Sequence, residues 1–416
     1  MGHTPAVKTG NTIPPASGGP DLSLLQKIPG DFPVNLYGFS ALDRYFGIPD
    51  LPFIQVETGA DISVLARTFE NLRFPGPALA DGAVDTNDGV CYFRCIDPEE
   101  PWRPSYTLLS FRQDIKTRRF RDPSGLYPLI RELRDGPPEK DGERETGPGE
   151  PWWTGLYSGA DSRRALMDGA LILARYGPAD EEPSRLIRKI AALFNRLPAG
   201  PPPGEEEQRL LLTGLLTSSR PGPGLELLKA AGFLREFWPE LADMDDVDHS
   251  KEFHPEGNVW KHTLETFRYR KPGPAFDLRL SLGLLLHDVG KTAAAPSGAH
   301  RFEGHAELGA RQARRFLERL GFEGPLVEDI FYLVRNHMLP AALPRLPLTR
   351  TEEIMTSPLF PTLMELYRCD ESSSFKGLDA YYESSAAYQA YLRYRRNPYR
   401  SADGRKLRNG VLREPR

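Results

Sequence analysis

The stretch Leu284-Leu285-Leu286-His287-Asp288-Val289-Gly290-Lys291 decides how the C-terminal half of this chain folds. Its apolar run is typical of a buried helix, and a glycine such as Gly290 is a residue at which a helix can stop. The imidazole of His287 and the carboxylate of Asp288 then lie side by side near the end of that helix. Nitrogen and oxygen donors of this kind bind divalent metals. A single His-Asp pair also arises by chance. Whether this pair binds a metal therefore depends on further candidate ligands elsewhere in the chain.

Further candidate ligands stand on other segments with helical periodicity. They are His262, His305, His337 and Asp370. A lone histidine on an apolar helix face is more often a core residue than a ligand. Asp288 and Asp370 are different, because a buried unpaired carboxylate is costly, and neither has a lysine or arginine one turn along its inward face. We therefore predict that the four histidines and two aspartates form a metal centre.

The donor set limits the metal and suggests a reaction. Oxygen and nitrogen ligands without thiolate suit Mn, Mg, Fe, Ni, Co or Zn, and the sequence does not choose among them. One ion needs only His262, the His-Asp pair and Asp370, while the two remaining histidines can hold a second. Two ions would activate water and hold phosphate oxygens, with Asp288 in the catalytic centre. Lys291 is then a candidate for binding phosphate, and its alternative is a surface lysine at a helix end.

The composition favours a globular protein of a reducing compartment. The 416 residues can form two or three domains, and the net charge of −4 does not by itself call for nucleic acid or a membrane. Three cysteines cannot make a disulfide framework, so we interpret Cys91, Cys95 and Cys369 as buried thiols. No apolar run reaches the roughly 18 residues of a membrane helix, and no signal pattern opens the chain. We therefore expect a soluble cytoplasmic protein.

Changes of pattern along the chain predict an α+β architecture, with a small N-terminal α/β head, an all-helical neck and a helical metal-binding domain. The predicted strands are 35–40, running into a turn, 53–58 and 90–94, and the predicted helices include 41–47, 162–176, 184–197 and 205–216. The predicted segments are a disordered tail (1–22), the head (23–135), a linker (136–152), the neck (153–245), the metal-binding domain (246–385) and a basic tail (386–416).

The last segment is basic and carries interleaved tyrosines. From Tyr391 on, nine arginines and lysines face only Asp403 and Glu414. A segment of this kind can stack on and hold an RNA strand. It can also simply be the solvated end of a helical domain. RNA is therefore a possible partner.

The candidate ligands also resemble a known family. The set His262, His287-Asp288 and Asp370 is similar to that of the HD superfamily of metal-dependent phosphohydrolases, and residues 287–291 match its central motif closely. Residues 253–263 resemble the entry to the HD domain of bacterial tRNA nucleotidyltransferases, the CCA-adding enzymes and their poly(A) polymerase relatives. Residues 161–176, 225–241 and 301–306 are similar to further segments of that family. The resemblance covers the chain from about residue 30.

The head departs from that family at the residues that transfer nucleotides. The resemblance implies a Gly-Gly and an Arg-Asp around the nucleotide, followed by an Asp-x-Asp pair on a strand that binds two magnesium ions. The matching places here hold Gly38-Phe39, Asp43-Arg44 and Phe53-Ile54-Gln55. Phenylalanine cannot bind magnesium and a glutamine replaces a carboxylate poorly. Because Asp50, Glu57 and Asp61 do not restore a pair two residues apart, we expect the head to be inactive.

The resemblance and the ligands together imply a metal-dependent HD-type phosphohydrolase. Its substrate is expected to be a phosphomonoester or phosphodiester of a nucleotide or an RNA end. Two alternatives stay open: a diverged tRNA nucleotidyltransferase or polynucleotide adenylyltransferase, and a non-catalytic RNA-binding scaffold. The sequence does not give the substrate, the number of ions or the oligomeric state.

Overall fold

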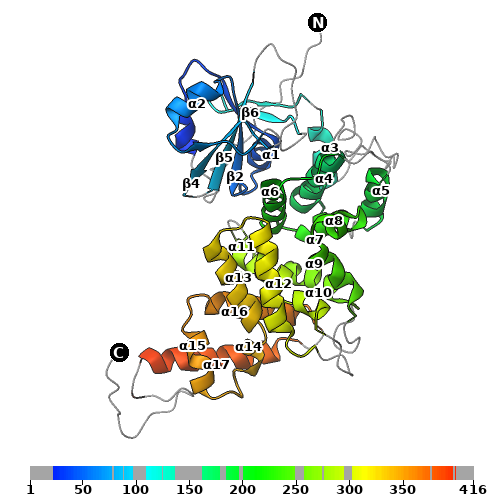
Figure 1. Ribbon diagram of the computed structural model, residues 1–416, viewed down its shortest axis with the longest axis vertical. Helices are drawn as coiled ribbons and strands as arrows, with labels where there is room; N and C mark the ends of the chain where they lie inside the picture. The colour runs from blue at the N-terminus through cyan, green and yellow to red at the C-terminus, as the bar shows by residue number, and fades with distance from the viewer. Residues whose placement is uncertain are drawn as a thin grey trace, which may run out of the picture. The chain divides into compact units, whose positions relative to one another are not determined.

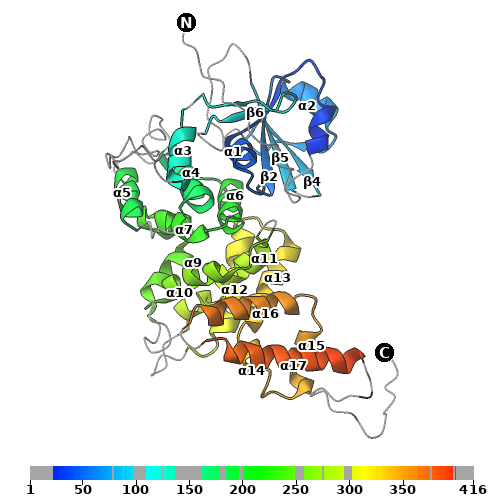
Figure 2. The ribbon, with the colours of Figure 1, turned by 180° about the vertical axis from the view of Figure 1, so that it is seen from behind.

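The chain folds into two compact units. The computed structural model describes residues 22–76, 79–87, 89–96, 109–123, 125–135, 162–178, 184–195, 200–248, 257–273, 276–294, 302–374, 377–396 and 399. The N-terminal unit comprises Met1–Gly232 with Pro272–Phe276, and the C-terminal unit comprises Phe233–Lys271 with Asp277–Arg416 (Figures 1 and 2).

A mixed sheet is the framework of the N-terminal unit. Its strands are β1 (Val34–Tyr37), β2 (Phe53–Thr58), β3 (Leu72–Arg73), β4 (Gly82–Thr86), β5 (Gly89–Cys95), β6 (Arg112–Asp114) and β7 (Phe120–Arg121). They lie in the order β3-β4-β5-β2-β1-β6-β7, with β2 and β5 parallel and the other neighbours antiparallel. Every residue of β2 is buried, which places this strand inside the core.

The predicted strands at 53–58 and 90–94 are confirmed, whereas the strand predicted for 35–40 ends at Tyr37. Gly38 already begins helix α1 (Gly38–Phe46), which ends before Gly47 in a left-handed conformation with φ of 65°. Strands β3, β4, β6 and β7 were not predicted, because strands of two to five residues carry too few residues for a pattern. The remaining helices around the sheet are η1 (Leu22–Lys27), α2 (Ile62–Thr68) and α3 (Tyr127–Asp135).

The neck helices follow the sheet in the same unit. They are α4 (Ser162–Tyr176), α5 (Ser184–Phe194), α6 (Glu205–Leu216) and α7 (Pro221–Ala230). The bounds predicted for α4 and α6 are confirmed, and α5 ends three residues before the predicted end. Arg175 of α4 joins this layer to the head, because its guanidinium lies 2.7 Å from the Asp43 carboxylate of α1. The Tyr176 hydroxyl donates to the same carboxylate at 2.7 Å.

The C-terminal unit is helical over its described residues, apart from one isolated bridge between Asp248 and Asn258. Its elements are α8 (Phe233–Phe237), α9 (Pro239–Ala242), η3 (Asp243–Asp246), α10 (Val259–Thr266), η4 (Phe267–Tyr269), α11 (Leu278–Leu286), η5 (Val289–Thr292), α12 (His305–Arg319), α13 (Gly324–Asn336), α14 (Leu339–Ala342), α15 (Leu348–Met355), α16 (Phe360–Ser372) and α17 (Asp379–Arg396). Helix α11 is buried from Leu280 to Leu286 and packs against α10, α13 and α16. This apolar helix is the centre of the unit, as the quoted stretch predicts.

Two expectations for the end of the chain are corrected. Helix α17 continues through residue 386, where the basic tail was predicted to begin. Tyr391 is buried against Tyr388, so it cannot serve as the exposed stacking residue that the sequence suggested. The remaining basic residues from 400 on, the tail 1–21, the linker 136–152 and residues 253–256 lie outside the described residues.

The state of the cysteines and the character of the helices bear on two expectations from the composition. All three cysteines are free thiols, but Cys95 is half-buried rather than buried, because it ends β5. None of the described helices combines the length and the apolar character needed to cross a membrane.

Candidate metal centre

Six helical elements of the C-terminal unit bring the six predicted ligands together. His262 lies within α10, His287 caps the end of α11, Asp288 leads into η5, His305 begins α12, His337 caps the end of α13, and Asp370 lies in α16. Each helix buries its apolar face, and the ligands therefore meet where these faces converge.

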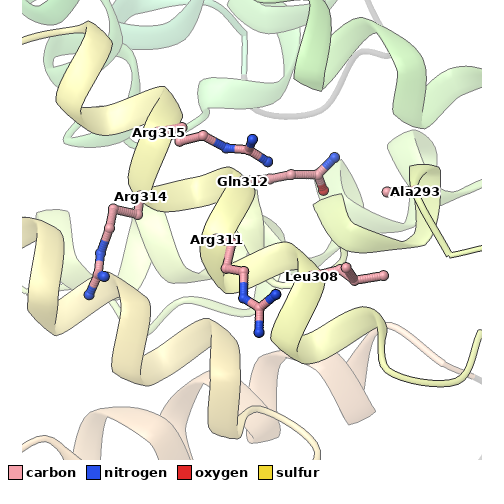
Figure 3. A pocket seen from close by; sticks show the side chains of 6 residues that line it. All are labelled: Ala293, Leu308, Arg311, Gln312, Arg314 and Arg315. Carbon is pink, nitrogen blue, oxygen red and sulfur yellow. The ribbon is translucent and has the colours of Figure 1, made fainter.

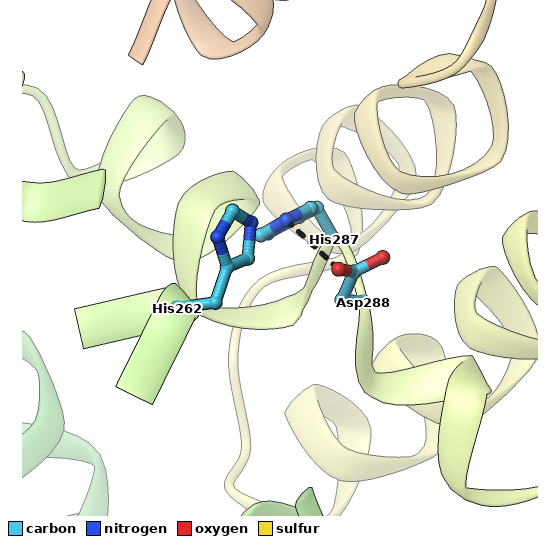
Figure 4. Close-up of side chains that lie close together, drawn as sticks. All are labelled: His262, His287 and Asp288. Carbon is cyan, nitrogen blue, oxygen red and sulfur yellow. Dashed lines mark ion pairs between the residues drawn. The ribbon is translucent and has the colours of Figure 1, made fainter. Parts of the chain in front are cut away.

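The ligands form two groups that share Asp288. In the first group, His262, His287 and Asp288 each offer one donor atom, and these atoms lie within 4.8 Å of one another (Figure 4). In the second group, Asp288, His305 and His337 meet the same criterion. The carboxylate divides between them, because its Oδ2 lies 3.4 Å from Nε2 of His287 while its Oδ1 lies 3.5 Å from Nε2 of His305. A carboxylate in this position can bridge two ions.

Asp370 lies at the edge of the first group. Its Oδ1 is 2.9 Å from Nε2 of His262 and 3.8 Å from Nε2 of His287. The side chain of Asp370 is 22% exposed, whereas those of His262 and His287 are 1% exposed. The centre therefore reaches solvent on the side of Asp370.

The protein holds the Nδ1 atom of each histidine and directs the Nε2 atom into the centre. Nδ1 of His287, His305 and His337 lies 2.8, 2.7 and 2.7 Å from the carbonyl oxygen three residues earlier in the chain. The Ser373 hydroxyl donates to the Asp370 carbonyl, so its oxygen accepts from Nδ1 of His262 at 3.3 Å. A proton held on Nδ1 leaves a lone pair on Nε2, which is the tautomer that a metal requires.

With these tautomers, the Nε2 atoms of His287, His305 and His337 carry lone pairs that point into the centre. Nε2 of His305 lies 3.1 Å from Nε2 of His337, and two lone pairs at this distance repel each other unless a cation or proton lies between them. Nε2 of His287 is buried and has no hydrogen-bond partner among the described residues. Buried polar groups are nearly always satisfied in folded proteins. The donor set therefore fits divalent metal ions.

Burial and charge keep these ligands in the protonation states that bind metal. Burial raises the pKa of Asp288, but the Lys291 ammonium beside it outweighs this effect and holds that pKa well below its usual range. Burial also raises the pKa of Asp370, and the contact with the His262 imidazole, whose Nε2 lies 2.9 Å from Oδ1, overcomes this effect, so the net shift is downward. Burial lowers the pKa of His305, and it lowers the pKa of His337 to about 4. At neutral pH the carboxylates are charged and both of these imidazoles are neutral.

Lys291 lies closer to Asp288 than the sequence indicated. Its ammonium is 2.6 Å from Oδ2 of Asp288, so the expectation that no cation lies one turn from this aspartate was wrong. The reason is local, because the tight turn of η5 brings the residue three positions later to the same side. The Lys291 side chain is 15% exposed and also lies over the Phe302 ring. It is not the surface lysine of the alternative interpretation.

Gly290 allows the two groups to approach each other. A Cβ atom at this position would lie 2.0 Å from the carbonyl oxygen of His305 and 2.4 Å from the backbone nitrogen of Gly309. Only glycine lets η5 lie this close to the first turns of α12. The glycine of the quoted stretch therefore does more than end a helix, because it places His305 beside Asp288.

In the head, the places that match the transfer site of the resembled family are occupied by internal contacts. The Gln55 side chain accepts a hydrogen bond from the Phe39 amide at 3.0 Å, and the Gln55 amide donates to the Ser40 hydroxyl at 2.9 Å. Glu57 is the single carboxylate on β2 and lies 3.1 Å from the guanidinium of Arg112. These residues connect β2 to α1 and neutralise the strand's charge.

A part of the C-terminal unit matches a known protein family. Residues 257–358 match the HD domain family, and this stretch contains His262, His287, Asp288, His305 and His337. The structure and the match together define an HD domain.

This HD domain belongs to a chain that is homologous to CCA-adding tRNA nucleotidyltransferases. The chain is 38% identical over 141 residues to the CC-adding tRNA nucleotidyltransferase of Thermus thermophilus, covering 33% of this chain and 32% of that protein. It is 27% identical over 288 residues to the multifunctional CCA protein of Stenotrophomonas maltophilia, covering 68% and 62% respectively. The match thus spans less than two thirds of each of these relatives.

Among solved structures, a tRNA-processing enzyme in an apo form covers 90% of this chain and 95% of its own, with 13% identity and a TM-score of 0.39. A CCA-adding enzyme in complex with ATP covers 91% and 81%, with 10% identity and a TM-score of 0.38. Likeness of this degree carries no information about function.

Proposed function

We propose that this chain is a metal-dependent phosphohydrolase that cleaves a phosphomonoester or phosphodiester bond of a nucleotide or an RNA end. The observation that carries this proposal is the pair of ligand groups that share Asp288. Four imidazoles present Nε2 lone pairs around one charged carboxylate, and this set suits two ions of the Mn, Fe, Co, Ni, Zn or Mg type. The donor atoms come from distant parts of the chain, which a core of chance histidines does not explain.

The residues of the centre have distinct parts in the proposed reaction. Divalent ions bound there supply Lewis-acid polarisation of phosphate oxygens and lower the pKa of water. His262, His287, Asp288 and Asp370 hold the first ion, and His305 and His337 hold the second together with Asp288. Their backbone partners fix the orientation of each ring before substrate arrives, which favours catalysis because no reorganisation is needed.

Substrate access follows from the exposure of the centre. Asp370, His305 and Lys291 are 22%, 11% and 15% exposed, so a phosphate group approaches from the side that they form. The Lys291 ammonium, which lies 2.6 Å from Asp288 Oδ2, would donate to a phosphoryl oxygen of the substrate in the proposed complex. A lysine ammonium is a compact charge with three donors and suits this role.

Steady-state assays of the purified full-length chain test the proposal. The substrates are an aryl phosphate monoester, an aryl phosphate diester and cyclic nucleotides, each with Mn²⁺, Ni²⁺ or Mg²⁺ and with a chelator. We expect turnover that depends on metal and is lost in a His287→Asn variant that still folds by circular dichroism. Absence of turnover with every metal contradicts the proposal.

Nucleotide addition to tRNA is a second candidate, favoured by the names of the relatives. It needs a carboxylate pair on β2, where this chain has Phe53 and Gln55 in the matching places and Glu57 as the single carboxylate of the strand. We therefore propose that the head does not transfer nucleotides. Incorporation of labelled CTP or ATP into tRNA by the wild-type chain, lost on Glu57→Gln replacement, would overturn this view.

A further inference from the structure

A pocket of about 420 Å³ lies in the unit that also holds the metal centre (Figure 3). Three arginines and one glutamine of α12 line it together with two smaller side chains. The lining residues are Ala293, Leu308, Arg311, Gln312, Arg314 and Arg315. Its walls therefore come from α12, which begins with His305, and from the residue that follows η5, the element that carries Lys291.

The helix repeat connects this pocket to the metal centre. His305, Leu308, Gln312 and Arg315 follow one another at spacings of three and four, so they form one stripe along α12. Figure 3 shows the side chains of Gln312 and Arg315 projecting from the same side of this helix, toward Ala293. Seven residues separate His305 from Gln312, which corresponds to roughly 10 Å along the helix axis. A ligand in the pocket thus lies about two helical turns from the centre.

The pocket is positively charged. No ion pair involves Arg315 within the part of the chain that the structure describes, and its guanidinium is exposed. Arg311 lies 3.1 Å from Glu307, but Arg335 lies 2.8 Å from the other oxygen of that carboxylate, so two guanidinium groups share one charge. Both arginines are more than half exposed, so these ion pairs are weak and available for exchange.

Gln312 adds a buried acceptor to this charged surface. Its Nε2 donates to the Thr292 hydroxyl at 3.4 Å, which orients the amide toward η5. Its Oε1 is buried and has no hydrogen-bond partner among the described residues. A buried acceptor without a partner costs free energy, which a ligand that brings an O–H or N–H group recovers.

We propose that this pocket binds the sugar–phosphate chain of single-stranded RNA whose end lies at the metal centre, an inference that rests on the proposed function. Arg311 and Arg315 contact a phosphate, and Gln312 accepts a hydrogen bond from a ribose hydroxyl. The roughly 10 Å along α12 between His305 and Gln312 is longer than the spacing of neighbouring phosphates in a strand, so the RNA spans more than one nucleotide between the two places. The substrate is therefore an oligonucleotide end rather than a mononucleotide.

Fluorescence anisotropy of the full-length chain with a labelled RNA hexanucleotide measures binding. The test variant is Arg311→Ser/Arg315→Ser, and the control is Arg345→Ser/Arg350→Ser, which removes the same charge from exposed arginines elsewhere in the unit. We expect the Kd of the test variant to rise about tenfold and that of the control to stay within twofold. Because each neutralised phosphate contributes about 0.7 to the salt slope for a single strand, and the two arginines share one phosphate, the slope of log K against log salt should fall by roughly 0.7 in the test variant.

Two further measurements test the proposal: the preference for RNA over DNA, and the turnover of a small substrate compared with that of an RNA end. The Gln312→Leu variant should lose the preference for RNA over DNA of the same sequence. Turnover of the small aryl phosphate should be unchanged in the Arg311→Ser/Arg315→Ser variant, while the KM for an RNA end rises. Equal affinity of the test variant and the wild type for the RNA would refute the proposal that this pocket binds RNA. If the wild type turns over no aryl phosphate with any metal, the proposed function fails, and the anisotropy result alone decides about the pocket.

Discussion

Replacement of Asp288 by asparagine should remove both ions from the metal centre while it preserves the shape of the side chain. Oδ1 of this residue faces His305 and His337 at 3.5 and 3.7 Å, and Oδ2 faces His287 at 3.4 Å. Both ligand groups therefore depend on the negative charge of the Asp288 carboxylate. A neutral amide removes that charge from both groups at once, so we expect metal content well below one ion per chain.

The expected change in stability follows from ligand linkage. An ion present at 100 times its Kd stabilises the folded state by about 2.7 kcal/mol, so two ions contribute about 5 kcal/mol. For a unit of this size, that corresponds to a rise in Tm of roughly 10–20 °C when metal replaces chelator. The wild type should show this rise and Asp288→Asn should not. In chelator, the variant is also less stable by about 3–5 kcal/mol, because its amide no longer pairs with the ammonium of Lys291.

Metal analysis of dialysed protein and thermal unfolding with and without metal measure these quantities. The matched controls are His262→Ala and His337→Ala, each of which removes one ligand from only one group. Each control should keep about one ion per chain and about half of the metal-induced rise in Tm. Two ions per chain in Asp288→Asn, or a rise in Tm equal to that of the wild type, would refute the shared carboxylate as the link between the groups.

Three further predictions concern single residues of the centre. Gly290→Ala should destabilise the chain by about 3 kcal/mol or more and remove one ion, because the added Cβ meets the His305 carbonyl at 2.0 Å; an unchanged denaturation midpoint contradicts this. Lys291→Met should keep its metal content but lose roughly 10²–10³ in kcat, and undiminished turnover would exclude the lysine from phosphate binding. The folded-state pKa of His337, about 4, lies below its unfolded value of 6.5, so the unfolded chain takes up the proton first. The metal-free wild type should therefore lose about 3 kcal/mol of stability, relative to His337→Gln, as pH falls from 6.5 to 4, and equal pH profiles of the two proteins contradict this.

The sequence predicted the buried helices well because their patterns are local. The apolar run before His287 has enough residues to show helical periodicity, and so do the segments that became α4 and α6. The carbonyl that receives each Nδ1 proton was not considered, although its spacing of three residues can be read at a helix end. Ser373 was also missed, because its contact with His262 joins residues more than 100 positions apart.

Two errors concern contacts between residues only three positions apart in the chain. The pairing of Lys291 with Asp288 depends on the tight turn of η5, which a regular helix count does not represent. Tyr391 was assigned to an exposed tail because its neighbours are basic, yet α17 buries its ring against Tyr388. Local composition describes the average exposure of a segment, whereas packing decides the exposure of each side chain.

By itself, the sequence determined the chemical types of the candidate ligands, the helices that carry them and the apolar faces that turn them inward. Only the tertiary structure decided that Asp288 lies between two pairs of histidines and that His305 approaches it across Gly290. The physical reason is that helix periodicity specifies direction within one segment, while the distance between segments depends on how closely their backbones pack. An alanine in place of one glycine would leave every local pattern intact and move the ligands apart.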